Sequence, residues 1–192
     1  SAVQGPYFLS AAIASAIAGV IVLAAVVRYV FNLEEIMKQE IFGGLSKVLA
    51  ITIPIYLWFV LHEQLTAQYA GPIVEKTISN SLLFGDFSML YWLVVGGLTL
   101  SFVYLFLQSV KAIPFSMKGT FVASLIVAVV LWWKRFLIVV PAFIYQRLPY
   151  PVGSYTPTWV EWSLLAGTVA ISTLLFALFV KVYPLMEIER GE

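Results

Sequence analysis

The sequence predicts an all-α integral membrane protein, built as a bundle of five transmembrane helices. The first observation is composition: 61% of the 192 residues are hydrophobic and 11% are charged, whereas soluble domains average about 45–50% and about 25%. The second is a set of separate, mostly apolar runs, each near the length of about 20 residues that crosses the hydrocarbon core. A soluble globular enzyme is therefore excluded, and the lipid bilayer is the expected solvent.

The predicted helices occupy residues 7–29, 45–69, 89–110, 120–145 and 158–182. Small residues over Ser10–Gly19 predict that the first helix packs closely on its neighbours, and Gly96-Gly97 indicates the same for the third. Pro54 in the second helix and Pro141 in the fourth each release a backbone carbonyl and favour a bend. Aromatic side chains near the predicted helix ends are expected to form an interfacial belt. These are Tyr7, Tyr69, Tyr91, Trp92, Tyr145, Tyr150, Trp159 and Trp162.

The connections are short and hold most of the charged residues. Residues 31–44 predict a short amphipathic helix on the membrane surface, with Asn32 as its cap. Residues 71–88 and 111–119 are predicted as loops, and the prolines in 147–157 predict a non-helical turn. We expect one membrane domain over residues 1–192.

Lys and Arg residues near the helix ends predict the orientation. One side of the membrane collects Arg28, Lys38, Lys47, Lys111, Lys118, Lys181 and Arg190, and the other collects Lys76 and Arg147. Because cytoplasmic loops carry the excess of Lys and Arg, the N-terminus is expected outside and the C-terminus in the cytoplasm. An outside start fits a chain that follows earlier helices, so we expect the C-terminal part of a longer or split subunit.

Residue counts exclude several kinds of site. A net charge of +1 argues against nucleic-acid binding. The absence of cysteine excludes a thiolate-held iron–sulfur cluster, a disulfide and a thiol nucleophile in this chain. The single histidine, His62, cannot supply the two axial ligands of a bis-histidine haem. We predict no catalytic residue and no metal site.

Ionisable residues inside the predicted spans are the candidates for function, because burying them in lipid costs several kcal/mol. Glu63, in the run His62-Glu63-Gln64, lies near the outer end of the second helix. One interpretation is proton relay or contact with a quinone hydroxyl; the other is a structural carboxylate paired with an arginine. A zincin site is excluded because Thr66 stands where the second histidine belongs.

Lys134-Arg135 lies within the fourth helix. Arg135 is expected to be held by a carboxylate, with a place in a charge pathway as the alternative, whereas Lys134 is expected on a different, partly wet side. Glu161 lies in the first turn of the fifth helix, where capping and the helix dipole favour it. A cluster of Glu63, Arg135 and Glu161 is also compatible with the topology.

Several segments resemble the NrfD / polysulfide-reductase family of membrane subunits. Glu63, Ala67, Tyr69, Gly71 and Glu75 follow the order of that family's Glu…Ala-x-Tyr-x-Gly…Glu pattern. Residues 135–141 resemble its Arg-Phe-x-Ile-Val-x-Pro run, and residues 155–162 resemble the entry to its last core helix. Gly5-Pro6-Tyr7-Phe8 and Leu33-Glu34-Glu35 resemble the start and end of an earlier helix. The similarity spans the C-terminal half of the family's usual length and is greatest to members of alternative complex III and of sulfur-metabolism complexes.

The resemblance implies a haem-free subunit of a respiratory electron-transfer complex in a prokaryotic cytoplasmic membrane. Such subunits couple quinone or quinol to an extracytoplasmic iron–sulfur, ferredoxin-like subunit and are linked to proton translocation. The family's quinone pocket is attributed to an N-terminal bundle, so the expected quinone lies at an interface with that missing half or with a second multi-helix subunit. Its candidate residues for quinone contact or proton transfer here are His62, Glu63, Tyr69, Arg135 and Glu161.

Two other classes of function remain open. A structural membrane anchor without its own quinone site predicts that changing Glu63 or Arg135 harms assembly alone. An independent transporter predicts function without redox partners, and such proteins usually contain internal repeats, which this sequence does not show.

Overall fold

The computed structural model describes residues 4–30, 37–145 and 155–182, and all secondary structure in these ranges is helical. The chain divides into two compact units, residues 1–153 and 154–192. Five of the helices are long and apolar enough to cross a membrane. The all-α membrane fold predicted from the sequence is therefore confirmed.

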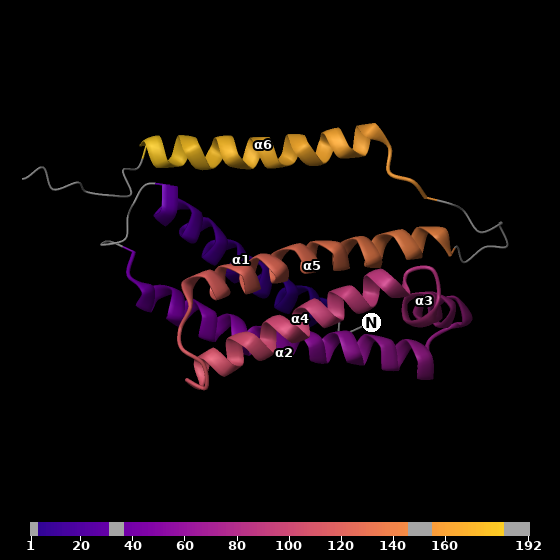
Figure 1. The fold of residues 1–192 in the computed structure, drawn as a ribbon. Helices are drawn as coiled ribbons and strands as arrows, with labels where there is room; N and C mark the ends of the chain where they lie inside the picture. The colour runs from indigo at the N-terminus through magenta and orange to yellow at the C-terminus, as the bar shows by residue number, and fades with distance from the viewer. Residues whose placement is uncertain (1–3, 31–36, 146–154, 183–192) are drawn as a thin grey trace, which may run out of the picture. The chain divides into compact units, whose positions relative to one another are not determined.

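The helices follow the predicted order, with one addition (Figure 1). They are α1 (Gln4–Val30), α2 (Gln39–Ala70), α3 (Ile73–Phe84), α4 (Ser88–Ser109), α5 (Met117–Ile144) and α6 (Trp159–Val182). The expected surface helix over residues 31–44 falls partly outside the described residues, and from Gln39 onward that segment belongs to α2. The short helix α3 occupies a connection that was predicted to be a loop. Most of the predicted turn at 147–157 also lies outside the described ranges. So do individual residues named in the sequence analysis, namely Asn32, Leu33, Glu34, Glu35, Arg147, Tyr150 and Arg190.

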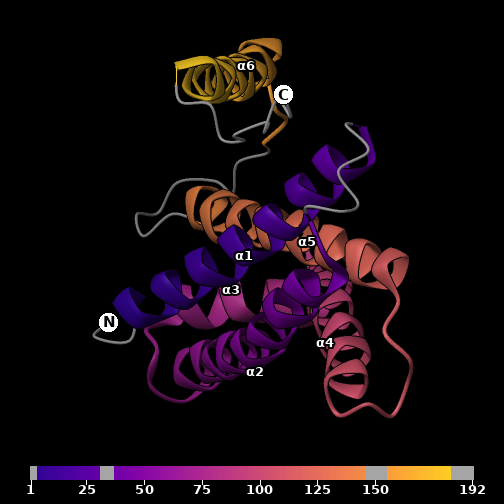
Figure 2. The same cartoon turned by 90° about the vertical axis from the view of Figure 1, so that its left-hand side faces the viewer.

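In the first unit, α1, α2, α4 and α5 form a ring in which each helix packs on its two neighbours, and α2 and α5 also meet across the middle (Figure 2). The beginning of α1 lies against the later half of α2, where Tyr7 stacks on Tyr56. The end of α1 lies near the start of α2, where the Arg28 guanidinium is 6.0 Å from the centre of the Phe42 ring. These two helices are therefore antiparallel, as their short connection requires.

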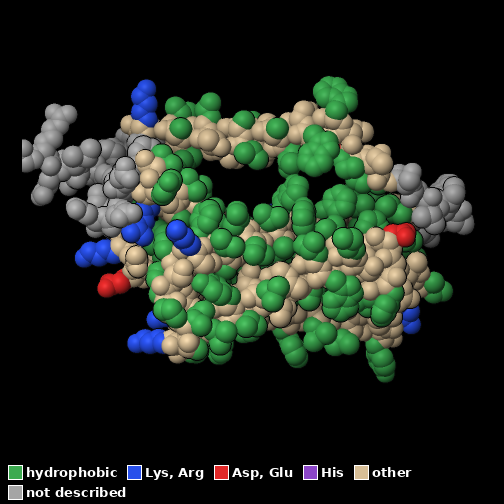
Figure 3. All heavy atoms as spheres, viewed as in Figure 1, with side chains coloured by type: hydrophobic (Ala, Val, Ile, Leu, Met, Phe, Trp, Pro, Cys, Tyr) green, Lys and Arg blue, Asp and Glu red, His purple; other side chains and the backbone are tan. Residues whose placement is uncertain are grey.

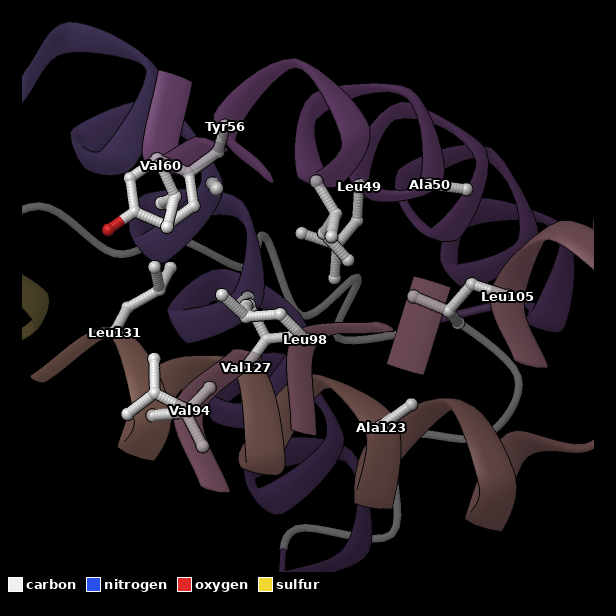
Figure 4. Packing of buried hydrophobic residues seen from close by; sticks show 14 of the residues in the cluster. Leu49, Ala50, Tyr56, Val60, Val94, Leu98, Leu105, Ala123, Val127 and Leu131 are labelled. Atoms are coloured by element: carbon white, nitrogen blue, oxygen red, sulfur yellow. The ribbon is translucent and has the colours of Figure 1, made fainter. Parts of the chain in front are cut away.

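The centre of this ring is filled by branched aliphatic side chains (Figure 4). Leu49, Leu98 and Val127 come from α2, α4 and α5, and each is at most 1% exposed. On α1 the equivalent positions are small, since Ala14 and Ala18 are buried and let the helix backbones approach. Ala14 and Ala18 thus have the packing role that the sequence predicted for the small residues of this span, whereas Ala12 and Ala16 are exposed.

Helix α3 packs across one end of the ring, against α2, α4 and α5. It begins after Pro72 and has 12 residues, too few to cross the hydrocarbon core. Ser79, Ser81 and Leu82 form its buried side. The polar content of this side explains why hydropathy alone gave no helix here.

Charge is divided unevenly between the two ends of the first unit. Figure 3 shows Lys and Arg side chains gathered at the end opposite α3, beside a broad apolar surface. This distribution matches the asymmetry of Lys and Arg counted from the sequence. An apolar surface of this extent is what a lipid environment requires.

The second unit is described by itself. Its helix α6 begins after Thr158, and the Glu161 carboxylate accepts a hydrogen bond of 2.9 Å from the Thr158 backbone N–H. A Glu at this position closes the first turn as one half of a capping box. The side chain of Glu161 therefore has a local structural role at the start of the helix.

Close packing of α4 on α5 gives a first testable prediction. A Cβ atom on Gly97 would lie 3.1 Å from Cγ1 of Val130 and 3.4 Å from Cγ2 of Ile126, whereas one on Gly96 would meet nothing within 4 Å. Because overpacking a tight contact costs about 1–3 kcal/mol, Gly97→Val should lower the free energy of unfolding by that amount.

The measurement is thermal or denaturant unfolding of the chain in detergent. Gly96→Val is the matched control, since it places the same β-branched residue on the same helix without the contact. Equal destabilisation by the two substitutions would show that the α4–α5 packing is not as described.

Candidate functional site

An ion pair joins α2 to α5 inside the helix ring. The ammonium Nζ of Lys134 lies 3.1 Å from Oε2 of Glu63. The Lys134 side chain is 2% exposed and that of Glu63 is 39% exposed. A lysine buried to this degree is stabilised as an ammonium only when a carboxylate and further polar or aromatic groups replace its water.

The helical period of α5 places Lys134 at the centre of the unit. Val127, Leu131, Lys134 and Leu137 are buried at spacings of three or four residues, which form one side of a helix. Arg135, one position later, is rotated by about 100° and is exposed. The same period on α2 brings Tyr56 and Glu63, seven residues apart, to one side.

Three tyrosines surround the ion pair. The ammonium of Lys134 lies 5.4 Å from the centre of the Tyr91 ring, a cation–π contact. The rings of Tyr7 and Tyr56 stack with centres 5.3 Å apart, and their hydroxyl oxygens are 3.3 Å apart. Tyr7 and Glu63 also line the same cavity. Tyr7 and Tyr91 are 5% and 4% exposed, so their predicted place in an interfacial belt is wrong.

A cavity of about 280 Å³ opens beside Glu63, between the start of α1, the end of α2 and α3. Its walls are formed by Gln4, Tyr7, Phe59, His62, Glu63, Gln64, Thr66, Ala67, Glu75, Ile78, Ser79 and Leu82. Several of these side chains are polar, so the cavity is suited to hold water or a small polar group. The carboxylate of Glu63 thus has the ammonium on one side and the cavity on the other.

Hydrogen bonds between α2 and α3 keep the cavity wall in place. The Ser79 hydroxyl donates to Oε1 of Gln64 over 2.6 Å. The Gln68 amide donates to the Ser79 hydroxyl and to Oδ1 of Asn80, over 3.0 Å and 2.7 Å. Since Gln64 and Ser79 are both buried, these bonds satisfy polar groups that lipid or apolar packing would leave unpaired.

The sequence predicted that a carboxylate would hold Arg135. In the structure the residue paired with a carboxylate is Lys134. Within the described residues of the first unit, no carboxylate lies within salt-bridge distance of Arg135. The expected wet side for Lys134 is also wrong, because this side chain is buried. The physical reason is helical geometry. Successive residues of α5 are rotated by about 100°, so Lys134 faces the inside of the ring and Arg135 faces outward.

The other predicted site residues lie in three different environments. His62 is exposed on the cavity wall, and its Nδ1 is 3.2 Å from the Thr66 hydroxyl. Tyr69 is 92% exposed and is not part of the cavity wall. Glu161 belongs to the second unit, where its carboxylate accepts a hydrogen bond of 2.9 Å from the Tyr155 hydroxyl and raises the pKa of that phenol.

Sequence reasoning missed four groups of this site as site residues: Lys134, Tyr7, Tyr56 and Tyr91. It also gave Glu75 no role of its own, although this carboxylate lines the cavity. The sequence held no signal that favours Lys134, because apolar residues flank both Lys134 and Arg135 at helical spacing. Within the described residues, no group of three or more His, Asp or Glu side chains is placed to hold a metal ion.

The unequal burial of the ion pair gives a second testable prediction. Glu63→Gln leaves the buried Lys134 ammonium without a counter-charge, so it should cost about 3–5 kcal/mol of stability. Lys134→Met leaves a carboxylate that water in the cavity can solvate, so it should cost about 1 kcal/mol or less.

The double variant Glu63→Gln/Lys134→Met removes both charges and should recover most of the loss caused by Glu63→Gln. The measurement is a double-mutant cycle of unfolding free energies in detergent. Additive losses, or a larger loss for Lys134→Met than for Glu63→Gln, would contradict the described pair.

Comparison with known proteins adds one informative similarity. No protein-family model matches the chain. Over 170 residues the chain is 26% identical to a selenate reductase subunit from Mesobacillus selenatarsenatis. The matched region covers 83% of this chain and 38% of that relative, so the chain spans well under half of the relative's length. The chain is thus similar to part of a reductase subunit.

Proposed function

We propose that the chain is a membrane subunit of an oxidoreductase complex, and that Glu63 takes up and releases a proton beside the Lys134 ammonium during quinone redox chemistry. The observation that carries the proposal is an ion pair with one member buried and the other on the wall of a polar cavity. The similarity to a reductase subunit supports membership in such a complex. The resemblance of residues 63–75 and 135–141 to the NrfD family supports quinone as the redox partner.

Quinol oxidation releases two electrons and two protons, and quinone reduction takes up the same numbers. The electrons pass to or from an iron–sulfur subunit, because this chain has no cysteine to hold a cluster. The quinone itself binds at an interface with an N-terminal bundle or a second membrane subunit. The part assigned to this chain is the movement of protons.

The arrangement around Glu63 suits that role. When a proton arrives from the cavity, the carboxylate becomes neutral and its attraction to the Lys134 ammonium falls. The Tyr7 and Tyr56 hydroxyls, 3.3 Å apart, provide the next positions for a proton away from the cavity. The Tyr91 ring continues to stabilise the ammonium while its carboxylate partner is neutral.

We place the α3 end of the first unit on the outside of a prokaryotic cytoplasmic membrane and the C-terminus of the chain in the cytoplasm. The excess of Lys and Arg at the opposite end supports this orientation. The cavity then opens on the same side as the extracytoplasmic iron–sulfur subunit.

A structural anchor is the second candidate, and the deep burial of Lys134 favours it. An ion pair with one member 2% exposed can hold α2 and α5 in register without moving a proton. The two functions differ in what they predict for a variant that assembles normally but has lost both charges.

That variant, Glu63→Gln/Lys134→Met, gives the third testable prediction. In the intact complex it should assemble normally and slow proton-coupled quinone turnover by about 10²-fold or more, since a positioned proton-transfer group contributes roughly 10²–10⁴-fold. The measurement is quinone-dependent turnover together with protons released per quinol oxidised.

Glu40→Gln is the matched control, since it removes an exposed carboxylate at the other end of α2 and should leave turnover unchanged. Normal turnover in the double variant would remove Glu63 and Lys134 from the proton path and leave the anchor as the function.

A further inference from the structure

Two buried serine hydroxyls inside the helix ring have no hydrogen-bond partner among the described residues. Ser101 on α4 is 3% exposed, and Ser124 on α5 is 0% exposed. Ser101 lies three residues after the buried Leu98, and Ser124 lies three residues before the buried Val127. At this helical spacing each serine shares the ring side of its helix with its apolar neighbour.

The register of α4 against α5 places the two serines at the same level. A Cβ atom on Gly97 would lie within 3.4 Å of Ile126 and Val130, so Gly97 faces the segment between these two residues. Because the helices are antiparallel, a position four residues after Gly97 lies opposite a position about four residues earlier on α5. These positions are Ser101 and Ser124, so the two unpaired hydroxyls belong to one place in the α4–α5 interface.

Other hydroxyls of α4 are satisfied by their own helix. Thr99 donates to the carbonyl oxygen of Val95, and Ser109 donates to that of Leu105. Ser101, which lies between them in the sequence, makes no such bond. An unpaired hydroxyl in an apolar interior is costly, because the bond that it made to water is not replaced. The two serines therefore lack a partner that the described protein atoms do not supply.

We propose that a buried water molecule binds between Ser101 and Ser124 and bridges α4 to α5. A buried water typically makes about three hydrogen bonds. The two serine hydroxyls supply two of them. Thr120 lies one turn before Ser124 and donates to Oε1 of Gln108 over 3.0 Å, so its hydroxyl oxygen keeps a lone pair for the third. The proposal goes beyond the proposed function and holds whichever function the chain has.

This water site is separate from the cavity at Glu63. Ser124 stands ten residues before Lys134, or roughly 15 Å along α5. Buried apolar side chains from α4 and α5 fill the ring between these two levels (Figure 4). They are Val94, Leu98, Val127 and Leu131. The water therefore lies, with the bond between Gln108 and Thr120, toward the end of the unit where Lys and Arg gather.

Removal of one hydroxyl gives the fourth testable prediction. Ser101→Ala and Ser124→Ala each take one partner from the water, so each should lower the Tm of the full chain in detergent by at least about 2 °C. The double variant should lower the Tm no further than the more damaging single variant, because the first substitution already breaks the bridge. The measurement is thermal unfolding of all three variants.

Ser46→Ala is the matched control. Ser46 is 2% exposed in the same ring, and its hydroxyl donates to the Gly43 carbonyl of its own helix. Its loss of Tm should add to that of Ser124→Ala. An unchanged or higher Tm for Ser101→Ala and Ser124→Ala would overturn the proposal, since removing an unpaired hydroxyl from a dry site costs nothing. Additive losses for these two would also overturn it, because they indicate separate bonds within each helix.

A density map of the wild-type chain, at a resolution that shows ordered water, decides the question if a variant does not fold. The expected result is a solvent peak within hydrogen-bonding distance of Oγ of both Ser101 and Ser124. A map without such a peak, or one in which each hydroxyl bonds to a carbonyl of its own helix, would overturn the proposal.

Discussion

The contact between the Lys134 ammonium and the Glu63 carboxylate, at 3.1 Å, joins α5 to α2 in the middle of an apolar helix ring. Removing a lysine from water costs several kcal/mol unless a counter-charge lies beside it. The ring can therefore keep its ammonium only while α2 and α5 hold this register. Helix α4 supports the same arrangement, because its Tyr91 ring contacts the ammonium and its Gly97 packs tightly on α5.

The short helix α3 makes this ion pair asymmetric. By packing across one end of the ring and bonding to α2 through Ser79, it forms a polar cavity that reaches Glu63 and not Lys134. A pair with both members sealed would serve stability alone. A carboxylate that faces a polar cavity on one side and an ammonium on the other has a route for a proton, which is the physical basis of the proposed function.

The five spans were predictable from the sequence because length and hydropathy decide them, but the side that each helix turns to the ring was not. On α5, Leu131 and Leu137 mark the inward side while Trp132 and Val139 mark the outward side, and all four are apolar. In a bilayer both sides of a helix are apolar, so the pattern does not show whether Lys134 or Arg135 turns inward. Helix α3 was missed because it is too short and polar to register as a span, and Tyr7 and Tyr91 because buried and interfacial tyrosines look alike in sequence.

The central claim is that Glu63 changes its protonation state when quinone is reduced or oxidised. Infrared difference spectroscopy of the intact complex, recorded between its oxidised and reduced states, measures this most directly. The account predicts a carboxylic acid C=O band in one state that is absent in the other and is lost in Glu63→Gln/Lys134→Met. The absence of such a band in the wild-type complex, or its persistence in that variant, would contradict the account.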